Sequence, residues 1–264
     1  MEDKKMKKSL LKLTVLLLII VAYNSNSYAQ ISGSEIMQKV DDQPQGTTKS
    51  SKMHMELINK RSKKRIRTML SYSKDYTKQT KSIMFFQQPA DVKGTGFLTW
   101  DYDSDDKWLY LPAMKNTRRI SGTSAKKEYF MGSDFTYDDL GNHDIDSEKY
   151  NLISEENLEG HNCWIIESTP VDDEGIYSQK KYWVRKDNFM VAKVEYYDKQ
   201  NNILKVLEVK QIEKIDGFWT ATEMVMVNHQ RNHKTIIKIE SIVYNDSYDD
   251  SIFTVNSLEK GYIN

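Results

Sequence analysis

Along most of the chain, apolar side chains recur at every second position in short runs. Met53, Met55 and Leu57 begin this pattern after Thr47, and the polar stretch 59–63 that follows them predicts a hairpin turn. Successive side chains of a β-strand point to opposite faces of a sheet, so each alternating run predicts a half-buried strand. The same pattern predicts further strands at 66–70, 83–86, 96–102, 107–111, 162–168, 180–185, 191–197, 203–212, 219–227 and 235–243.

One helix is predicted in front of the first strand. Ser32 is a suitable N-cap residue, and Glu35, three positions later, completes a capping box. The helix is expected to end at residues 41–44, because the residue before Pro44 disfavours helical geometry. The sequence therefore predicts a short helix that leads directly into the strands.

Most of the predicted strands have no helix between them, which favours an antiparallel barrel or a strongly curved sheet. The exception is 124–141, where Ala125–Met131 and Asp134–Leu140 are compatible with short helices or with a lid. No internal repeat and no interdomain linker is evident. We therefore expect a single domain over residues 30–264.

The N-terminus has the layout of a secretory signal peptide. Four lysines lie between positions 4 and 8, an apolar stretch runs from Leu10 to Ala22, and Ser27-Tyr28-Ala29 places small residues where a signal peptidase reads them. The apolar stretch is short for a transmembrane helix. We predict cleavage after Ala29 and export to the cell envelope or the exterior; a retained anchor helix is the alternative.

Charge and cysteine content exclude several classes of function. The chain has 38 basic and 38 acidic side chains, so its formal net charge is zero. This balance argues against a nucleic-acid binder, which needs a clustered excess of Lys and Arg. A single cysteine, Cys163, excludes an intrachain disulfide and a zinc site built from several thiolates. Its place in a predicted strand favours a buried structural thiol.

Catalytic and cofactor motifs are incomplete wherever they begin. Gly94-Thr95-Gly96 lacks the third glycine of a dinucleotide loop, and the aspartates 101–105 are not followed by the glycine and glutamate of a calcium loop. His229 and His233 are four residues apart, but no Glu follows His229 as a zinc protease requires. The sequence therefore predicts a protein that is not an enzyme and has neither a cofactor nor a metal site.

The densest aromatic stretch surrounds a predicted hairpin loop at 103–105. That loop would place Trp100 opposite Trp108 and Leu98 opposite Tyr110 on one face of the sheet. Such a face can be an ordinary aromatic core or the wall of an apolar cavity inside a curved sheet. The arginine pair 118–119 that follows is suited to forked hydrogen bonds with a carboxylate or phosphate, or is a surface pair.

Three co-ordered motifs in this region resemble a known family. They are Trp100-Asp101-Tyr102, the run from Trp108 to Met114 with Arg118-Arg119-Ile120-Ser121 after it, and the run from Phe130 to Leu140. Together they resemble the outer membrane lipoprotein-sorting protein family, the longer branch of the LolA-like periplasmic proteins.

The resemblance implies a fold and a set of site residues. The fold is a half-open, strongly curved antiparallel β-barrel with a few helices forming a lid over an apolar cavity. In this sequence the expected cavity residues are Leu98, Trp100, Trp108, Tyr110 and Met114. The expected lid residues are Phe130, Met131 and Phe135, and the expected residues at the cavity mouth are Arg118 and Arg119.

The resemblance also implies a function in the periplasm. LolA-like carriers bind the acyl chains of lipoproteins, and members of the longer branch are associated with RND-type (MMPL-like) inner-membrane exporters. We therefore expect a non-enzymatic carrier of lipoprotein acyl chains or of another lipid towards the outer membrane. The alternative is an envelope sensor or adaptor that works with an RND/MMPL-type exporter.

Overall fold

The computed structural model describes residues 31–76, 79–101, 106–121, 125, 127–141, 144–172 and 175–261. The predicted signal peptide, residues 1–29, lies outside the described residues. Cleavage after Ala29 and a domain that starts at residue 30 therefore stay predictions. No helix in the described part of the chain is both long and apolar enough to cross a membrane.

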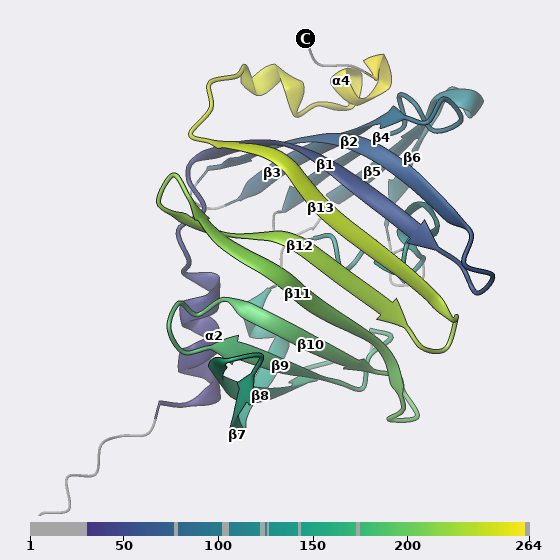
Figure 1. Cartoon of the computed structure of the whole chain (residues 1–264). Helices are drawn as coiled ribbons and strands as arrows, with labels where there is room; N and C mark the ends of the chain where they lie inside the picture. The colour runs from purple at the N-terminus through teal and green to yellow at the C-terminus, as the bar shows by residue number, and fades with distance from the viewer. Residues whose placement is uncertain are drawn as a thin grey trace, which may run out of the picture. The chain divides into compact units, whose positions relative to one another are not determined.

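Thirteen strands form one antiparallel sheet. Its spatial order is β6-β5-β4-β3-β2-β1-β13-β12-β11-β10-β9-β8-β7, and β1 pairs with β13 in the middle. The two edge strands, β6 and β7, do not pair with each other, so the curved sheet stays open, as the half-open barrel requires (Figure 1). The strands are β1 Thr48–Ile58, β2 Lys64–Asp75, β3 Thr80–Gln88, β4 Gly96–Asp101, β5 Asp106–Leu111, β6 Asn116–Ile120, β7 Glu148–Leu158, β8 His161–Pro170, β9 Gln179–Arg185, β10 Val191–Tyr197, β11 Ile203–Ile215, β12 Phe218–Asn228 and β13 His233–Tyr244.

The sheet order determines where the link between the two edge strands must run. β6 and β7 are consecutive in sequence but lie at opposite edges of the sheet. The chain between them, 121–147, therefore has to cross from one edge to the other. Part of it, residues 129–139, packs on the concave face and is called the inner segment below.

The alternating pattern predicted eleven of the strands correctly, and it missed the two edge strands. β6 has one buried residue, Ile120, and β7 is exposed over most of its length. An edge strand with little buried surface shows no apolar alternation, which explains why both were missed. The predicted structural thiol is confirmed, since Cys163 is fully buried beside Ile165 and Trp183.

The predicted register of the aromatic hairpin is wrong by two residues. Leu98 pairs with Trp108, and Trp100 pairs with Asp106. Trp100 and Trp108 still touch, with ring centroids 4.8 Å apart, because diagonal neighbours on one sheet face are within reach of large aromatic side chains.

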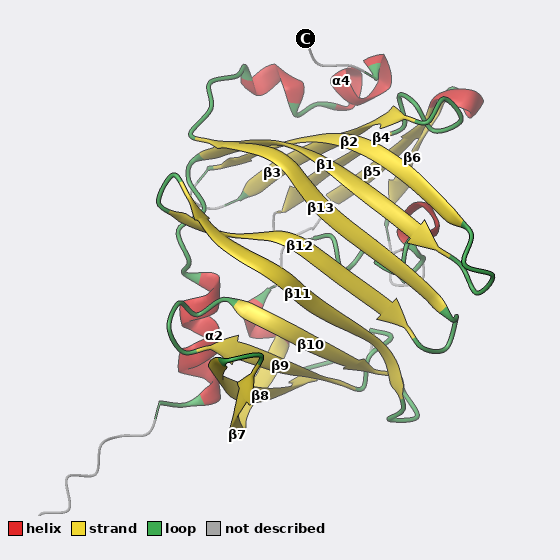
Figure 2. Cartoon of the chain, in the orientation of Figure 1, coloured by secondary structure: helices red, strands yellow, loops and turns green. Residues whose placement is uncertain are grey.

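Two α-helices accompany the sheet in the described residues, α2 (Gly33–Asp41) and α4 (Val255–Lys260) (Figure 2). α2 confirms the predicted helix and packs on β7. The predicted helices in 124–141 are not seen in the described residues 127–141. These residues form a 3-10 turn, Phe130–Gly132, and a bridge between Tyr129 and Thr136.

The C-terminal segment, residues 250–260, covers the other face of β3–β5. Phe253 and Leu258 are buried there against Ile83, Phe85 and Leu98. The Trp100 indole Nε1 donates a hydrogen bond to the Phe253 carbonyl at 3.0 Å. Figure 1 shows α4 on the outside of the sheet, away from the space that the sheet curves around.

We predict that Gly96→Val destabilises this packing. A Cβ atom at Gly96 would lie 2.6 Å from Leu258 Cδ1 and 3.1 Å from the Phe85 ring, so a branched side chain overfills the contact. The free energy of unfolding in urea should fall by about 1–3 kcal/mol. Gly175→Val, where the nearest described atom is 3.9 Å from the new Cβ, is the control and should change it much less. Equal losses for both variants would contradict this account.

Candidate functional site

The residues predicted for the cavity wall and the residues predicted for its lid lie on opposite faces of the sheet. Leu98, Trp100, Trp108 and Tyr110 all pack in the cluster beneath the C-terminal segment. The next residue along β4, Phe97, points to the concave face instead, where its ring contacts Phe130 at 5.1 Å. Lipid contact at the first four residues therefore stays a prediction, and in this structure their partners are Ile252, Phe253 and Leu258.

The other predicted site residues are also placed by the structure. Met114 ends the 3-10 turn Pro112–Met114 and is 67% exposed. Phe130 and Phe135 of the predicted lid are buried, and Met131 between them is partly exposed. Phe130, Met131 and Phe135 thus belong to the inner segment, on the concave face.

The predicted mouth residues lie on the edge strand β6 and are both half-exposed. The Arg118 guanidinium hydrogen-bonds to the Glu128 carboxylate at 2.9 Å, and this bond raises the pKa of Arg118. Arg119 pairs with Asp106 and lies over the Trp108 ring. Since neighbouring residues of a strand face opposite ways, only Arg118 is on the side of the inner segment. A role at a cavity mouth stays a prediction for both.

An aromatic cluster anchors one side of the inner segment. The Phe130 ring is fully buried. In addition to Phe97, it contacts Phe86 and Tyr137, with ring centroids 5.8 and 5.6 Å apart. Arg67 of β2 closes the cluster, because its guanidinium lies 5.5 Å from the Phe86 ring and donates to the Met131 carbonyl at 2.5 Å. Burial lowers the pKa of Arg67. This side of the contact is held mainly by apolar surface.

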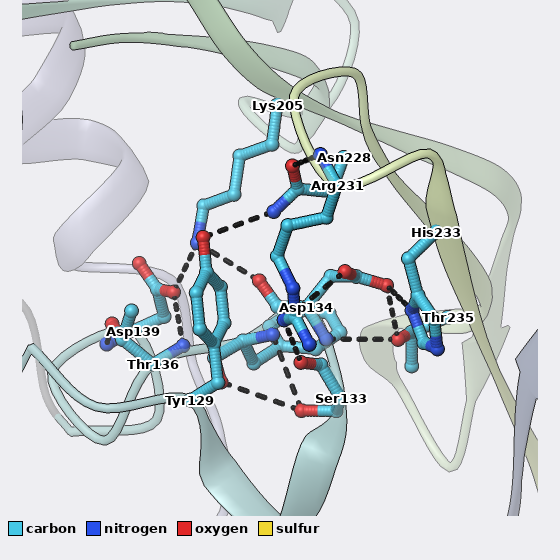
Figure 3. Close-up of polar contacts among 11 residues, drawn as sticks. Tyr129, Ser133, Asp134, Thr136, Asp139, Lys205, Asn228, Arg231, His233 and Thr235 are labelled. Carbon is cyan, nitrogen blue, oxygen red and sulfur yellow. Dashed lines mark hydrogen bonds and ion pairs between the residues drawn. The ribbon is translucent and has the colours of Figure 1, made fainter. Parts of the chain in front are cut away.

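Hydrogen bonds from β13 hold the opposite side of the inner segment. The buried Asp134 carboxylate pairs with His233 Nδ1 at 2.6 Å and accepts a hydrogen bond from Thr235 Oγ1 at 2.7 Å. The Asp134 backbone N–H donates to the same Thr235 oxygen at 2.9 Å. Figure 3 shows Asp134 pointing between His233 and Thr235.

The turn between β12 and β13 adds a cation to this contact. Arg231 donates to the Ser133 carbonyl at 3.0 Å, and its guanidinium lies 4.0 Å from the centre of the Tyr129 ring. The Tyr129 hydroxyl in turn accepts a hydrogen bond from Asn228 at 3.0 Å. The Arg231 guanidinium therefore stacks on the Tyr129 ring and forms a cation–π contact.

Lys205 of β11 forms the deepest polar contact. Its side chain is fully buried, and its Nζ donates to the Asp139 carboxylate and, at 3.0 Å, to the Asp134 carbonyl. Asp139 also accepts a hydrogen bond from the Tyr177 hydroxyl at 2.7 Å. Burial lowers the pKa of Lys205, and the neighbouring Asp139 opposes this shift. The ammonium group also lies 5.0 Å from the Tyr196 ring.

The concave face is consequently divided. A second buried ion pair, Glu148–Lys180, lies near Tyr182, whose hydroxyl donates to Glu148 at 3.3 Å. Tyrosines and ion pairs therefore occupy the half formed by β7–β13, whereas phenylalanines occupy the half formed by β2–β5. The inner segment contacts both halves.

Sequence reasoning did not find the polar partners of the inner segment. Asp134 and His233 are 99 residues apart, and Lys205 and Asp134 are 71 apart, so no local motif joins them. The sequence offers one signal in this region, the His229–His233 spacing, which lacks the glutamate of a zinc protease. The described residues contain no group of three His, Cys, Asp or Glu side chains that could hold a metal ion.

Comparison with known proteins identifies the family. A family model described as that of an uncharacterized protein matches residues 78–260. A solved chain from Vibrio parahaemolyticus, assigned to an outer membrane lipoprotein-sorting protein domain, shares 31% identity with a TM-score of 0.81. The match covers 86% of this chain and 98% of that one. This chain belongs to the outer membrane lipoprotein-sorting protein family.

Two further solved structures place this family member among related folds. A DUF1329 family protein from Desulfovibrio piger shares 36% identity with a TM-score of 0.81, over 86% of this chain and 97% of that one. A LolA superfamily protein from Nitrosomonas europaea shares 18% identity with a TM-score of 0.69, over 86% of this chain and 100% of that one. The latter likeness shows the fold alone. Comparison with curated proteins finds no match.

We predict that Asp139→Asn lowers the free energy of unfolding of this protein by about 3–5 kcal/mol. The substitution leaves Lys205 buried without the carboxylate that it pairs with. Urea unfolding followed by circular dichroism measures the loss. Asp138→Asn removes an exposed carboxylate next to it and is the control, with an expected change within about 0.5 kcal/mol. Adding Lys205→Met to Asp139→Asn should recover part of the stability. A double variant less stable than Asp139→Asn alone would contradict the assignment.

The buried tyrosines predict how stability falls in alkali. Burial raises the pKa of Tyr177, Tyr182 and Tyr196 well above 10.0. Above pH 10 these tyrosines lose their protons in the unfolded state but keep them in the folded state. The free energy of unfolding is therefore highest below this pH and decreases above it. Three such groups give a slope of about 4 kcal/mol per pH unit. Tyrosinate absorbance should therefore rise together with unfolding; full ionisation of all tyrosines in the folded protein would contradict this.

Proposed function

We propose that this protein is a non-enzymatic periplasmic carrier that binds an acyl chain of a lipoprotein, or of another lipid, on its concave face. The observation that carries the proposal is the match to the Vibrio parahaemolyticus chain, which is assigned to lipoprotein sorting. The two chains share 31% identity, and the match covers 98% of that chain. The open, curved sheet with a segment lying across its concave face supports the proposal.

The inner segment is suited to leave the sheet and return. Among the described residues, its backbone-to-backbone hydrogen bonds stay local, such as those from Phe130 N to the Phe135 carbonyl and from Tyr137 N to the Glu128 carbonyl. It is held to the strands by side chains, through Asp134, Lys205 and the Phe130 ring. Its departure would therefore break no strand pairing, and the sheet would keep its shape.

The free energy gained by burying an acyl chain is similar in size to the free energy lost by exposing the aromatic rings of the inner segment. Burial of one methylene contributes about 0.8 kcal/mol, so a tail of ~14 carbons gains roughly 10 kcal/mol against water. Phe130, Phe135 and Tyr137 are buried, and exposing them costs roughly 1.5–3 kcal/mol each, about 5–9 kcal/mol together. An acyl chain can thus offset the exposure of these rings, while the polar contacts of Asp134 and Asp139 add to the cost of moving the segment. A carrier needs this balance in order to load and to unload.

The proposed acyl site is therefore the region around Phe86, Phe97 and Phe130. The cluster of Leu98, Trp100, Trp108 and Tyr110 would serve instead only if the C-terminal segment moved, since Leu258 and Phe253 cover it. An RND/MMPL-type exporter as partner, for a carrier or for a sensor, stays a prediction.

The prediction that follows is that Phe130→Ala binds acyl chains more tightly. Truncating this buried ring weakens the contact that competes with the cargo by about 3 kcal/mol or more, so affinity should rise at least tenfold. Titration with a dansyl-labelled undecanoic acid, followed by its fluorescence, measures this affinity.

Two variants on the other face are the controls for this titration. Phe253→Ala removes an equally buried ring, and Trp100→Gln removes a predicted cavity residue; both should bind within twofold of the unchanged protein. Loss of binding in Trp100→Gln with no change in Phe130→Ala would move the site beneath the C-terminal segment, as predicted from the sequence. No binding by the unchanged protein and by all variants would reject the carrier.

A further inference from the structure

The hairpin between β1 and β2 concentrates positive charge in a chain whose formal net charge is zero. Residues 59–66 are all exposed, and five of these eight side chains are cationic. We call residues 58–66 the basic hairpin. Its cations are Lys60, Arg61, Lys63, Lys64 and Arg65.

The turn of the basic hairpin is ordered without help from its cations. The Asn59 side-chain oxygen accepts hydrogen bonds from the backbone N–H groups of Arg61 and Lys63, at 2.9 and 3.1 Å. Among the residues that the structure describes, Lys64 forms an ion pair with Glu56, at 2.6 Å, and no acidic side chain pairs with the other four cations. Their charge is therefore presented to solvent at fixed backbone positions.

An exposed apolar residue accompanies the charge. Ile66, next to Arg65, is 58% exposed, although a β-branched apolar side chain in a strand is usually half-buried. Cations interleaved with an apolar side chain are typical of surfaces that lie at a membrane interface, where the charges meet anionic head groups and the apolar side chain enters the boundary region.

We propose that the basic hairpin binds the surface of a bilayer that contains anionic phospholipids. Lys64 and Arg65 are consecutive residues of β2, so their side chains point to opposite sides of the hairpin, and the other three cations lie in its turn, as expected for a field of many equivalent head groups. An acidic protein partner would instead be matched by cations gathered on one face. This proposal goes beyond the carrier function and does not depend on which cargo is bound.

The position of the hairpin supports a membrane contact during loading. Arg65 and Arg67 lie two residues apart on β2 and so share one face, and Arg67 donates to the Met131 carbonyl of the inner segment. Figure 1 shows the hairpin at the same end of the strands as the turn between β12 and β13, which carries Arg231. A bilayer at the basic hairpin would therefore lie at the end of the sheet where the inner segment is held.

Co-sedimentation with lipid vesicles tests the proposal. The unchanged protein should bind vesicles of phosphatidylcholine with 30% phosphatidylglycerol, bind pure phosphatidylcholine vesicles much less, and dissociate at 0.5 M NaCl, where charges are screened. Each cation near an anionic surface is worth about fivefold in affinity, so the variant Lys60→Ala/Arg61→Ala/Lys63→Ala should bind about 100-fold more weakly.

A matched variant separates the hairpin from net charge. Lys186→Ala/Lys214→Ala/Lys238→Ala removes the same charge from other strands and turns and should bind within about threefold of the unchanged protein. Equal losses in the two triple variants, or no binding of the unchanged protein to the anionic vesicles, would overturn the proposal. So would a hairpin variant that binds vesicles normally, and the hairpin would then be tested against acidic proteins. Acyl-probe affinity should be the same in both triple variants, which keeps this test apart from that of the carrier function.

Discussion

The pairing of β1 with β13 is the constraint on which the rest of the structure depends. It places the first and last strands at the centre of the sheet and leaves two strands that are consecutive in sequence, β6 and β7, at opposite edges. The link between them then has to cross the concave face. The inner segment, its aromatic anchor at Phe130 and its polar anchor at Asp134 all follow from this single topological fact.

The two anchors differ in what they contribute. Phe130 is buried among aromatic rings. This contact is strong, but it does not require a single relative orientation of the rings. Asp134 and Asp139 meet His233, Thr235 and Lys205 in one geometry only, and burying those charges offsets most of what their attraction gains. The polar anchor therefore sets the register of the inner segment on the sheet more than it stabilises the fold. The position of the inner segment on the sheet is therefore defined by these polar contacts.

The sequence pattern predicted most strands and the helix at Ser32, because alternation and capping are local properties. It missed β6 and β7, whose exposed positions such as Arg118 and Ile153 carry no buried face to reveal them. It also grouped Leu98 and Phe130 in one site. Alternation shows that Leu98 and Phe97 face opposite ways, but what covers each face depends on segments far along the chain. For the same reason, the partners of Lys205 were not predictable.

The central strand pair also determines the order in which the chain can fold. Thr47 and Asn245 hydrogen-bond across a separation of 198 residues, whereas nearly all other strand neighbours are joined by short hairpins. Closing so long a loop costs conformational entropy that no local contact repays. We therefore expect the two meanders, β1–β6 and β7–β13, to form first as separate units and to join late. Until they join, β1 and β13 are edge strands with unpaired backbone groups, and a chain in that state is vulnerable to aggregation.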